Sequence, residues 1–160
     1  MTETTAPIAK ALLFPTDFSS WSLAAFPVAE RYAAGMGLRL LVLHVVRTGM
    51  RRSTPHELTD MPDSLRCHMS GIRPARLVIP FEHLAYGGAP GPTICCVAQR
   101  RKCELIVMGT RGSLGWPQLL WGSVTSYVVR NAPCPVTTVR QRPQTDESKA
   151  PDVCLALGTS

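Results

Sequence analysis

The sequence predicts an α/β fold, in which short strands alternate with helices and form a parallel sheet that helices cover on both faces. Two observations support this prediction. Short apolar runs with the length of buried strands recur along the chain, and segments with apolar residues at helical spacing lie between them. Glycine, proline and N-capping residues separate the two kinds of segment, as expected where strands and helices end.

The first third of the chain predicts a strand, a helix and a second strand. Residues 11–14 (ALLF) form a short apolar run that Pro15 ends. Ser19 and Ser20 then open a helix, and Pro27 is expected to kink it because proline removes one backbone hydrogen bond. Residues 39–46 (RLLVLHVV) are almost all apolar, which predicts a central parallel strand. The apolar face of this helix is indicated by Trp21, Ala25, Val28 and Tyr32, and its end by Gly35 and Gly37.

The middle of the chain carries weaker signals. Residues 47–74 are polar and interrupted by proline, and a third strand is expected within residues 75–81. Residues 87–92, rich in glycine and proline, are expected to form a turn, because they lack the Gly-Lys-Ser/Thr ending of a phosphate-binding P-loop. One short helix is predicted from a sparse stripe formed by Glu57, Leu58, Met61, Leu65 and Met69.

The last third predicts two helices and two strands. Residues 104–108 (ELIVM) are expected to form the fourth strand, residues 124–131 a helix, and PVTTV, from Pro135 to Val139, the fifth strand. Residues 1–142 are predicted to form one domain, and the polar residues 143–160 a mobile tail. The helix before the fourth strand is indicated by Ile94, Val97, Ala98 and Arg101.

The composition argues against several classes of protein. The apolar runs are far shorter than the ~18–20 residues of a membrane span, and the N-terminus lacks the apolar core of a secretory signal. We therefore expect a cytoplasmic protein without a membrane partner, whose 6 cysteines remain thiols. The 17 Lys and Arg against 11 Asp and Glu leave a net charge of +6, but the basic residues form no stripe with interleaved aromatics. Nucleic acid is therefore not an expected partner.

Residues that follow the predicted strands are the candidates for a ligand site. In parallel α/β sheets, ligands bind beyond the carboxyl ends of the strands, near the point where the strand order reverses. This rule indicates Pro15, Thr16 and Asp17 after the first strand, Val45 at the end of the second, and the segment from Gly109 onward after the fourth.

A glycine pattern follows the fourth strand. The spacing Gly-x2-Gly-x9-Gly-Ser is formed by Gly109, Gly112, Gly122 and Ser123. Glycine at a strand exit lets backbone N–H groups approach an anion closely, and a Gly-Ser pair at a helix start adds N–H donors and the positive end of the helix dipole. Such a pattern suits a di- or triphosphate, although the same glycines also serve turn geometry.

These motifs resemble the universal stress proteins, in the subgroup that binds ATP. The resemblance covers roughly residues 9–140 and is carried by KALLFPTDFS, LHVV, ELIVMGTRG, the glycine-serine pattern and PCPVTTVR. It implies a five-stranded, Rossmann-like parallel sheet of order 3-2-1-4-5, with ATP across the ends of strands one and four. It also implies a homodimer through the strand from Pro135 to Val139, and Mg²⁺ or Mn²⁺ is expected with the nucleotide. Residues 47–91 depart from the family pattern.

The resemblance also implies roles for single residues. Asp17 would contact the nucleoside and Val45 the adenine. The ribose and phosphate contacts would come from Met108, Gly109, Gly112, Gly122, Ser123 and Val124. Other interpretations remain open, because Asp17 and Ser123 are also good helix caps, and Arg111 either contacts a phosphate or is simply solvated.

The chain contains no motif that pairs a nucleophile with a base, such as Gly-x-Ser-x-Gly or a close carboxylate pair. His56, Cys67 and His68 do not match the spacing of a standard zinc site. We therefore expect an ATP-binding regulator of the stress response or an interaction module. The alternatives are a dimeric interaction protein of the same fold without nucleotide, and a slow ATPase.

Overall fold

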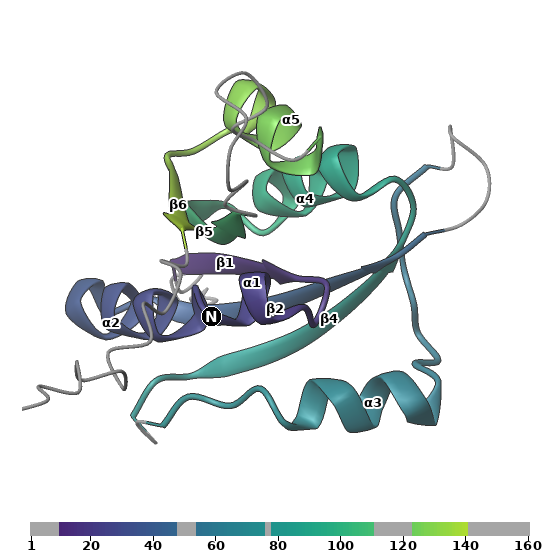
Figure 1. Ribbon diagram of the computed structural model, residues 1–160, viewed down its shortest axis with the longest axis horizontal. Helices are drawn as coiled ribbons and strands as arrows, with labels where there is room; N and C mark the ends of the chain where they lie inside the picture. The colour runs from purple at the N-terminus through teal and green to yellow at the C-terminus, as the bar shows by residue number, and fades with distance from the viewer. Residues whose placement is uncertain (1–9, 48–53, 76–77, 111–122, 141–160) are drawn as a thin grey trace, which may run out of the picture.

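Figure 1 shows the computed structural model of the chain, which describes residues 10–47, 54–75, 78–110 and 123–140. Within these ranges six strands form one sheet, in the spatial order β3-β4-β2-β1-β5-β6. The strands are β1 (Ala11–Thr16), β2 (Arg39–Val46), β3 (His56–Glu57), β4 (Phe81–Gly87), β5 (Cys103–Thr110) and β6 (Val136–Arg140). The helices are α1 (Ser20–Leu23), α2 (Phe26–Met36), α3 (Asp63–Ser70), α4 (Pro90–Arg100) and α5 (Ser123–Asn131).

The predicted α/β fold is confirmed. Strands β4, β2, β1, β5 and β6 pair in parallel and follow the predicted order 3-2-1-4-5. The sheet has one strand more than predicted, because β3 adds an antiparallel edge to β4. Glu57, which the sequence pattern assigns to a helix, therefore lies in a strand. Its carboxylate accepts a hydrogen bond of 2.9 Å from the hydroxyl of Tyr86.

Two apolar layers join the helices to opposite faces of the sheet. Successive strand residues point to opposite faces, so Leu13 belongs to one core cluster and Leu12 to the other. In Figure 1, α4 and α5 lie above the sheet and α3 lies below it. The helices α4 and α5 cover the first cluster with Ile94, Val97, Ala98 and Val128, whereas α2 and α3 cover the second with Ala29, Ala33 and Met69.

The single kinked helix expected after β1 is in fact two helices. Helix α1 ends at Leu23 and α2 begins at Phe26, so Pro27 lies in the first turn of α2 and not in a helix interior. Proline fits there because the N–H group that it lacks would have no partner inside the helix. Gly37 ends α2 in the left-handed conformation, with φ 63°, and the predicted glycine stop is confirmed.

The third parallel strand lies later in the chain than predicted. The expectation for residues 75–81 is wrong, because β4 begins only at Phe81 and the side chain of Val78 is 90% exposed. The sequence of β4 looks too polar for a buried strand, but its polar side chains have partners. Glu82 accepts two hydrogen bonds from Arg101, at 3.0 and 3.3 Å, and the His83 ring bonds a backbone carbonyl.

Two further boundaries differ from the prediction. Helix α3 contains only Leu65 and Met69 of the predicted stripe. Residues 87–92 are not one turn, because Gly87 ends β4 and Pro90 already begins α4, where proline is favoured. The predicted elements at residues 104–108, 124–131 and 135–139 are confirmed as β5, α5 and β6, with ends shifted by at most two residues. The predicted tail, residues 143–160, lies outside the described residues.

Candidate functional site

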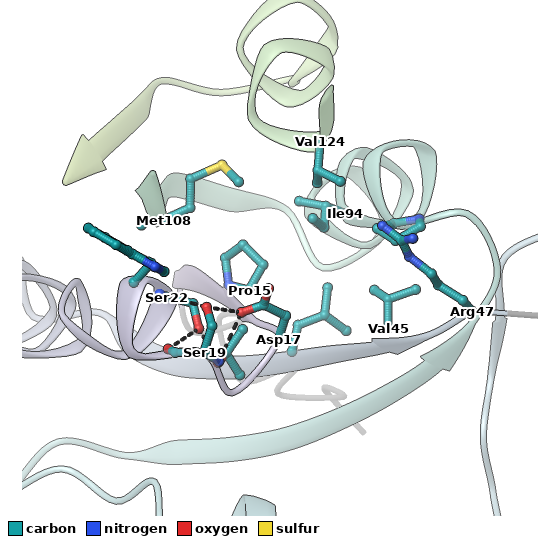
Figure 2. Close-up of a pocket in the computed structure, with 14 residues that line it drawn as sticks. Pro15, Asp17, Ser19, Ser22, Val45, Arg47, Ile94, Met108 and Val124 are labelled. Atoms are coloured by element: carbon teal, nitrogen blue, oxygen red, sulfur yellow. Dashed lines mark hydrogen bonds between the residues drawn. The ribbon is translucent and has the colours of Figure 1, made fainter. Parts of the chain in front are cut away.

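A pocket of about 290 Å³ opens at the carboxyl ends of β1, β2 and β5 (Figure 2). Strand β1 lies between β2 and β5, so the pocket crosses the middle of the sheet and is closed on one side by α4 and α5. This is the position at which parallel α/β sheets bind ligands. The lining is formed by Pro15, Thr16, Asp17, Ser19, Trp21, Ser22, Leu43, Val45, Arg47, Pro90, Ile94, Met108, Gly109 and Val124.

The pocket brings together most of the residues that the sequence indicated. Those that line it are Pro15, Thr16, Asp17, Val45, Met108, Gly109 and Val124. Ser123 begins α5 and so lies next to Val124 in the chain. The remaining candidates, Arg111, Gly112 and Gly122, lie outside the described residues.

The parallel register explains why these distant residues meet. Thr16 pairs with His44 across β1 and β2, which places Asp17 and Val45 at the same edge of the sheet. On the other side of β1, Leu13 pairs with Ile106 of β5, so Gly109 of β5 lies beside the end of β1. Because the strands are parallel, the three segments that follow them meet at one edge of the sheet, although no local sequence signal links them.

Asp17 lies in the turn between β1 and α1. Its Oδ1 accepts hydrogen bonds from the backbone N–H of Ser19, at 3.0 Å, and from the Ser19 hydroxyl, at 2.5 Å. Burial would raise the pKa of Asp17, but these hydrogen bonds outweigh it and lower the pKa below 3.8. The N-cap of α1 is Ser19, whose side chain accepts from Ser22 N–H. Asp17 is therefore an ionised turn residue at the pocket wall and does not cap the helix itself.

Thr16 has a scaffolding role in the same turn. Its hydroxyl oxygen accepts from Phe18 N–H at 3.0 Å and lies 3.0 Å from the Ser22 hydroxyl. Because Ser22 donates its own proton to the Ser19 carbonyl, Thr16 is the donor to Ser22. The hydroxyl groups of β1 and α1 thus bond to each other, and Thr16 is buried.

Phe18 anchors this turn against the second core cluster, the one that α2 and α3 cover. It adopts a left-handed backbone with φ 62°, which costs a non-glycine residue energy and requires compensating contacts. Its ring stacks on His44 of β2, with centroids 4.4 Å apart, and also contacts His68 of α3 at 5.5 Å. His44 Nδ1 bonds the Thr16 carbonyl at 2.9 Å, and it carries the proton because a carbonyl only accepts.

Gly109 allows the close approach of helix to strand. A Cβ atom there would collide with the backbone carbonyl of Trp21 and lie 2.8 Å from the Cα of Ser22. The sequence suggests that this glycine serves an anion, but its first requirement is the packing of α1 directly onto β5.

Several lining residues are missed by the sequence analysis. Arg47 directly follows β2, so the strand-end rule that indicates Val45 would also have found it. Trp21 and Ser22 belong to α1, next to Asp17 in the chain. Pro90 and Ile94 of α4 have no local signal, because they reach the pocket only through the packing of α4 on the sheet.

The pocket is apolar towards the end of β2 and polar beside α1. In Figure 2, Val45, Ile94 and Val124 lie together on one side, and Asp17, Ser19 and Ser22 on the other. Among the described lining residues, Arg47 is the only cation and Asp17 the only carboxylate. Such a lining suits a flat apolar ring system that carries polar groups at one end.

Two negative findings concern the described part of the chain only. It contains no group of three or more His, Cys, Asp or Glu side chains placed to hold a metal ion. In the same part of the chain, none of the helices has both the length and the apolar character needed to cross a bilayer.

The model of the universal stress protein family matches residues 9–140. A universal stress protein from Thermus aquaticus, encoded in the 3′ region of a QAH/OAS sulfhydrylase, is 33% identical over 140 residues. That match covers 82% of this chain and 98% of the relative. Sequence similarity therefore extends over about four fifths of this chain and nearly the whole of the relative.

Solved structures show the same fold. MJ0577 of Methanocaldococcus jannaschii superposes with a TM-score of 0.65 at 20% identity, covering 85% of this chain and 99% of that one. A universal stress protein family protein from Arabidopsis thaliana, solved with AMP bound, gives a TM-score of 0.56 at 19% identity. The superposition covers 88% of this chain and 97% of the Arabidopsis chain.

Proposed function

Because this chain belongs to the universal stress protein family, we propose that it binds ATP and acts as a nucleotide-dependent stress-response regulator or interaction module. The observation that supports this most is the pocket itself. One cavity collects residues from the ends of β1, β2 and β5 that sequence motifs had selected independently. The AMP bound to the Arabidopsis relative supports an adenine nucleotide as the class of ligand.

The lining fits the parts of a nucleotide in turn. The apolar wall around Val45 and Ile94 suits a nucleobase, and Asp17 offers an ionised oxygen to ribose hydroxyl groups. The phosphates would lie towards Gly109 and the start of α5, where helix N–H groups point outward. Val124 would lie between the two regions.

Mg²⁺ or Mn²⁺ would be held mainly by the nucleotide. Asp17 is the only carboxylate in the described lining, and a single carboxylate does not form a metal cage by itself. Magnesium is commonly bound through substrate phosphates with one or two protein oxygens, so this donor set fits a metal that enters with ATP. The metal would neutralise phosphate charge, and Asp17 would orient the ribose.

Thermal unfolding with and without ligand tests the proposal. With Mg-ATP at 100 times Kd, we expect about 2.7 kcal/mol of added stability and a rise in Tm. Heat-denatured, freshly purified protein should also release adenine nucleotide on chromatography. If neither ATP, ADP nor AMP shifts the unfolding and no nucleotide is released, the protein acts without nucleotide.

We also propose that the protein forms a homodimer through β6. Among the described strands, β6 lies at the edge of the sheet and pairs only with β5. The carbonyls of Pro135 and Val139 accept hydrogen bonds from β5, so the backbone groups of the alternating residues Val136, Thr138 and Arg140 point to the open edge. An edge of this kind can be satisfied by the same strand of a second copy.

A further inference from the structure

Arg47 is a charged side chain in the pocket that the proposed function does not yet use. It directly follows β2, is exposed and lines the cavity. Within the described residues it forms no hydrogen bond or ion pair, whereas Arg39 and Arg101 both pair with Glu82. Its guanidinium is therefore available to a ligand.

The position of Arg47 separates it from Gly109. Strand β1 lies between the end of β2 and the exit of β5, so Arg47 and Gly109 lie on opposite sides of Asp17. In Figure 2 the Arg47 side chain rises beside Val45 towards Ile94 and Val124, and Met108 lies farther off, beyond Ile94. Arg47 thus stands next to the apolar wall and not next to the start of the glycine pattern.

The chemistry of this end of the pocket favours contact with a ring. A guanidinium is planar, weakly hydrated and stacks on aromatic faces, whereas Lys forms a compact, strongly hydrated point charge. A flat base that rests on Val45 and Ile94 would leave its other face open, and an unpaired Arg47 is placed to cover it. The exposed side chain can close over the base without breaking any bond of the described structure.

We infer that Arg47 is a specificity-determining residue that stacks on the nucleobase of the bound nucleotide. This inference rests on the proposed nucleotide function. It assigns Arg47 to recognition of the ring system and leaves the phosphates to the backbone N–H groups near Gly109 and the start of α5. A purine, which offers the larger face, is then the favoured base.

The test compares binding of Mg-ATP and inorganic tripolyphosphate to the wild type and to three variants by titration calorimetry. Arg47→Ala should weaken ATP binding about five- to thirty-fold, which corresponds to a cation–π contact of about 1–2 kcal/mol. Arg47→Lys should recover only part of this loss because it restores charge without the planar group. The control Arg31→Ala removes an exposed cation of α2 that does not line the pocket, and should bind as the wild type does.

The two ligands separate the possible outcomes. Unchanged tripolyphosphate binding in Arg47→Ala, together with weakened ATP binding, supports contact with the base. An equal loss for both ligands, or full recovery by Lys, would overturn the inference and indicate contact with a phosphate. Wild-type affinity for ATP in Arg47→Ala overturns it as well. Failure of the wild type to bind ATP would instead contradict the proposed function.

Discussion

The ring of Phe18 stacks on the imidazole of His44, with centroids 4.4 Å apart and an interplanar angle of 27°. The contact joins the turn after β1, which also carries Asp17 of the pocket wall, to the neighbouring strand β2. It also compensates for the left-handed backbone at Phe18. The shape of the pocket therefore depends on a residue that does not line it.

Removal of the Phe18 ring should destabilise this turn. Phe18→Ala is expected to lower the free energy of unfolding by about 2 kcal/mol, because partial burial of the ring and its aromatic contacts are lost. Urea denaturation measures the change. Tyr32→Ala is the control, since Tyr32 is an exposed aromatic side chain of α2 and should matter much less. Equal effects of the two substitutions would show that the Phe18 contacts contribute no more to stability than an exposed aromatic side chain does.

Gly109 should tolerate no side chain. Gly109→Ala is expected to cost roughly 1–3 kcal/mol or more, because the new Cβ would collide with the backbone of α1. Gly35→Ala provides a matched control inside α2, where a Cβ meets nothing within 4 Å and should stabilise the helix by about 0.5–1 kcal/mol. Chemical denaturation of both variants checks the opposite signs, and a neutral Gly109→Ala would contradict the packing described here.

Asp17 should contribute to stability only while it is ionised. Its pKa in the folded protein lies below the ordinary value of 3.8, so the unfolded chain binds the proton more readily near that pH. The contribution is therefore present above about pH 4 and is lost as the pH falls through the folded pKa. The difference in unfolding free energy between the wild type and Asp17→Asn should shrink in acid, while Asn still accepts from Ser19. If this difference grew in acid, folding would raise the pKa of Asp17 and not lower it.

The cysteines should differ strongly in reactivity. Burial raises the pKa of Cys103 to about 12, and the nearby Cys134 thiol adds to the shift, whereas Cys67 is exposed. Iodoacetamide at neutral pH should label Cys67 and leave Cys103 unmodified until the protein unfolds, because the thiolate is the reactive form. Peptide mass spectrometry distinguishes the sites. Rapid labelling of Cys103 in the folded protein would contradict its burial.

The same thiol should produce a loss of stability in alkali. In the unfolded chain Cys103 ionises near pH 9, but in the folded protein it stays neutral until about pH 12. The contribution of the Cys103 thiol to the free energy of unfolding is therefore fully present below pH 9 and decreases as the pH rises from 9 to about 12. Cys103→Ala should reduce the alkaline slope of the unfolding free energy.

Thr138 tests the proposed dimer. Its backbone groups point to the open edge of β6, so Thr138→Pro should remove an edge donor without breaking the pairing with β5. Light scattering should then give the monomer mass. Thr138→Val keeps the backbone N–H and should keep the dimer. If the proline variant retains the dimer mass, the two copies do not pair through β6.

The strands that the sequence predicted well are buried on both faces of the sheet. RLLVLHVV and ELIVM are apolar on both sides because helices cover both faces of the sheet, and their composition alone identifies them as β2 and β5. β4 was placed wrongly for the opposite reason. Its residues Glu82 and His83 are polar, and they fit in a strand because they pair with β2 and their side chains bond to Arg101 and to the Ile72 carbonyl.

The sequence by itself determined the α/β fold and the candidate residues at the strand ends, because strand composition and strand ends are local properties. The order of the parallel strands and the pocket residues Met108 and Val124 were implied by the resemblance to the universal stress proteins. Only the tertiary structure decided the rest. Pro90 and Ile94 join the pocket through the packing of α4 on the sheet, and Gly109 is constrained by the backbone of α1. Such contacts depend on how distant segments pack in three dimensions, and no spacing along the chain records them.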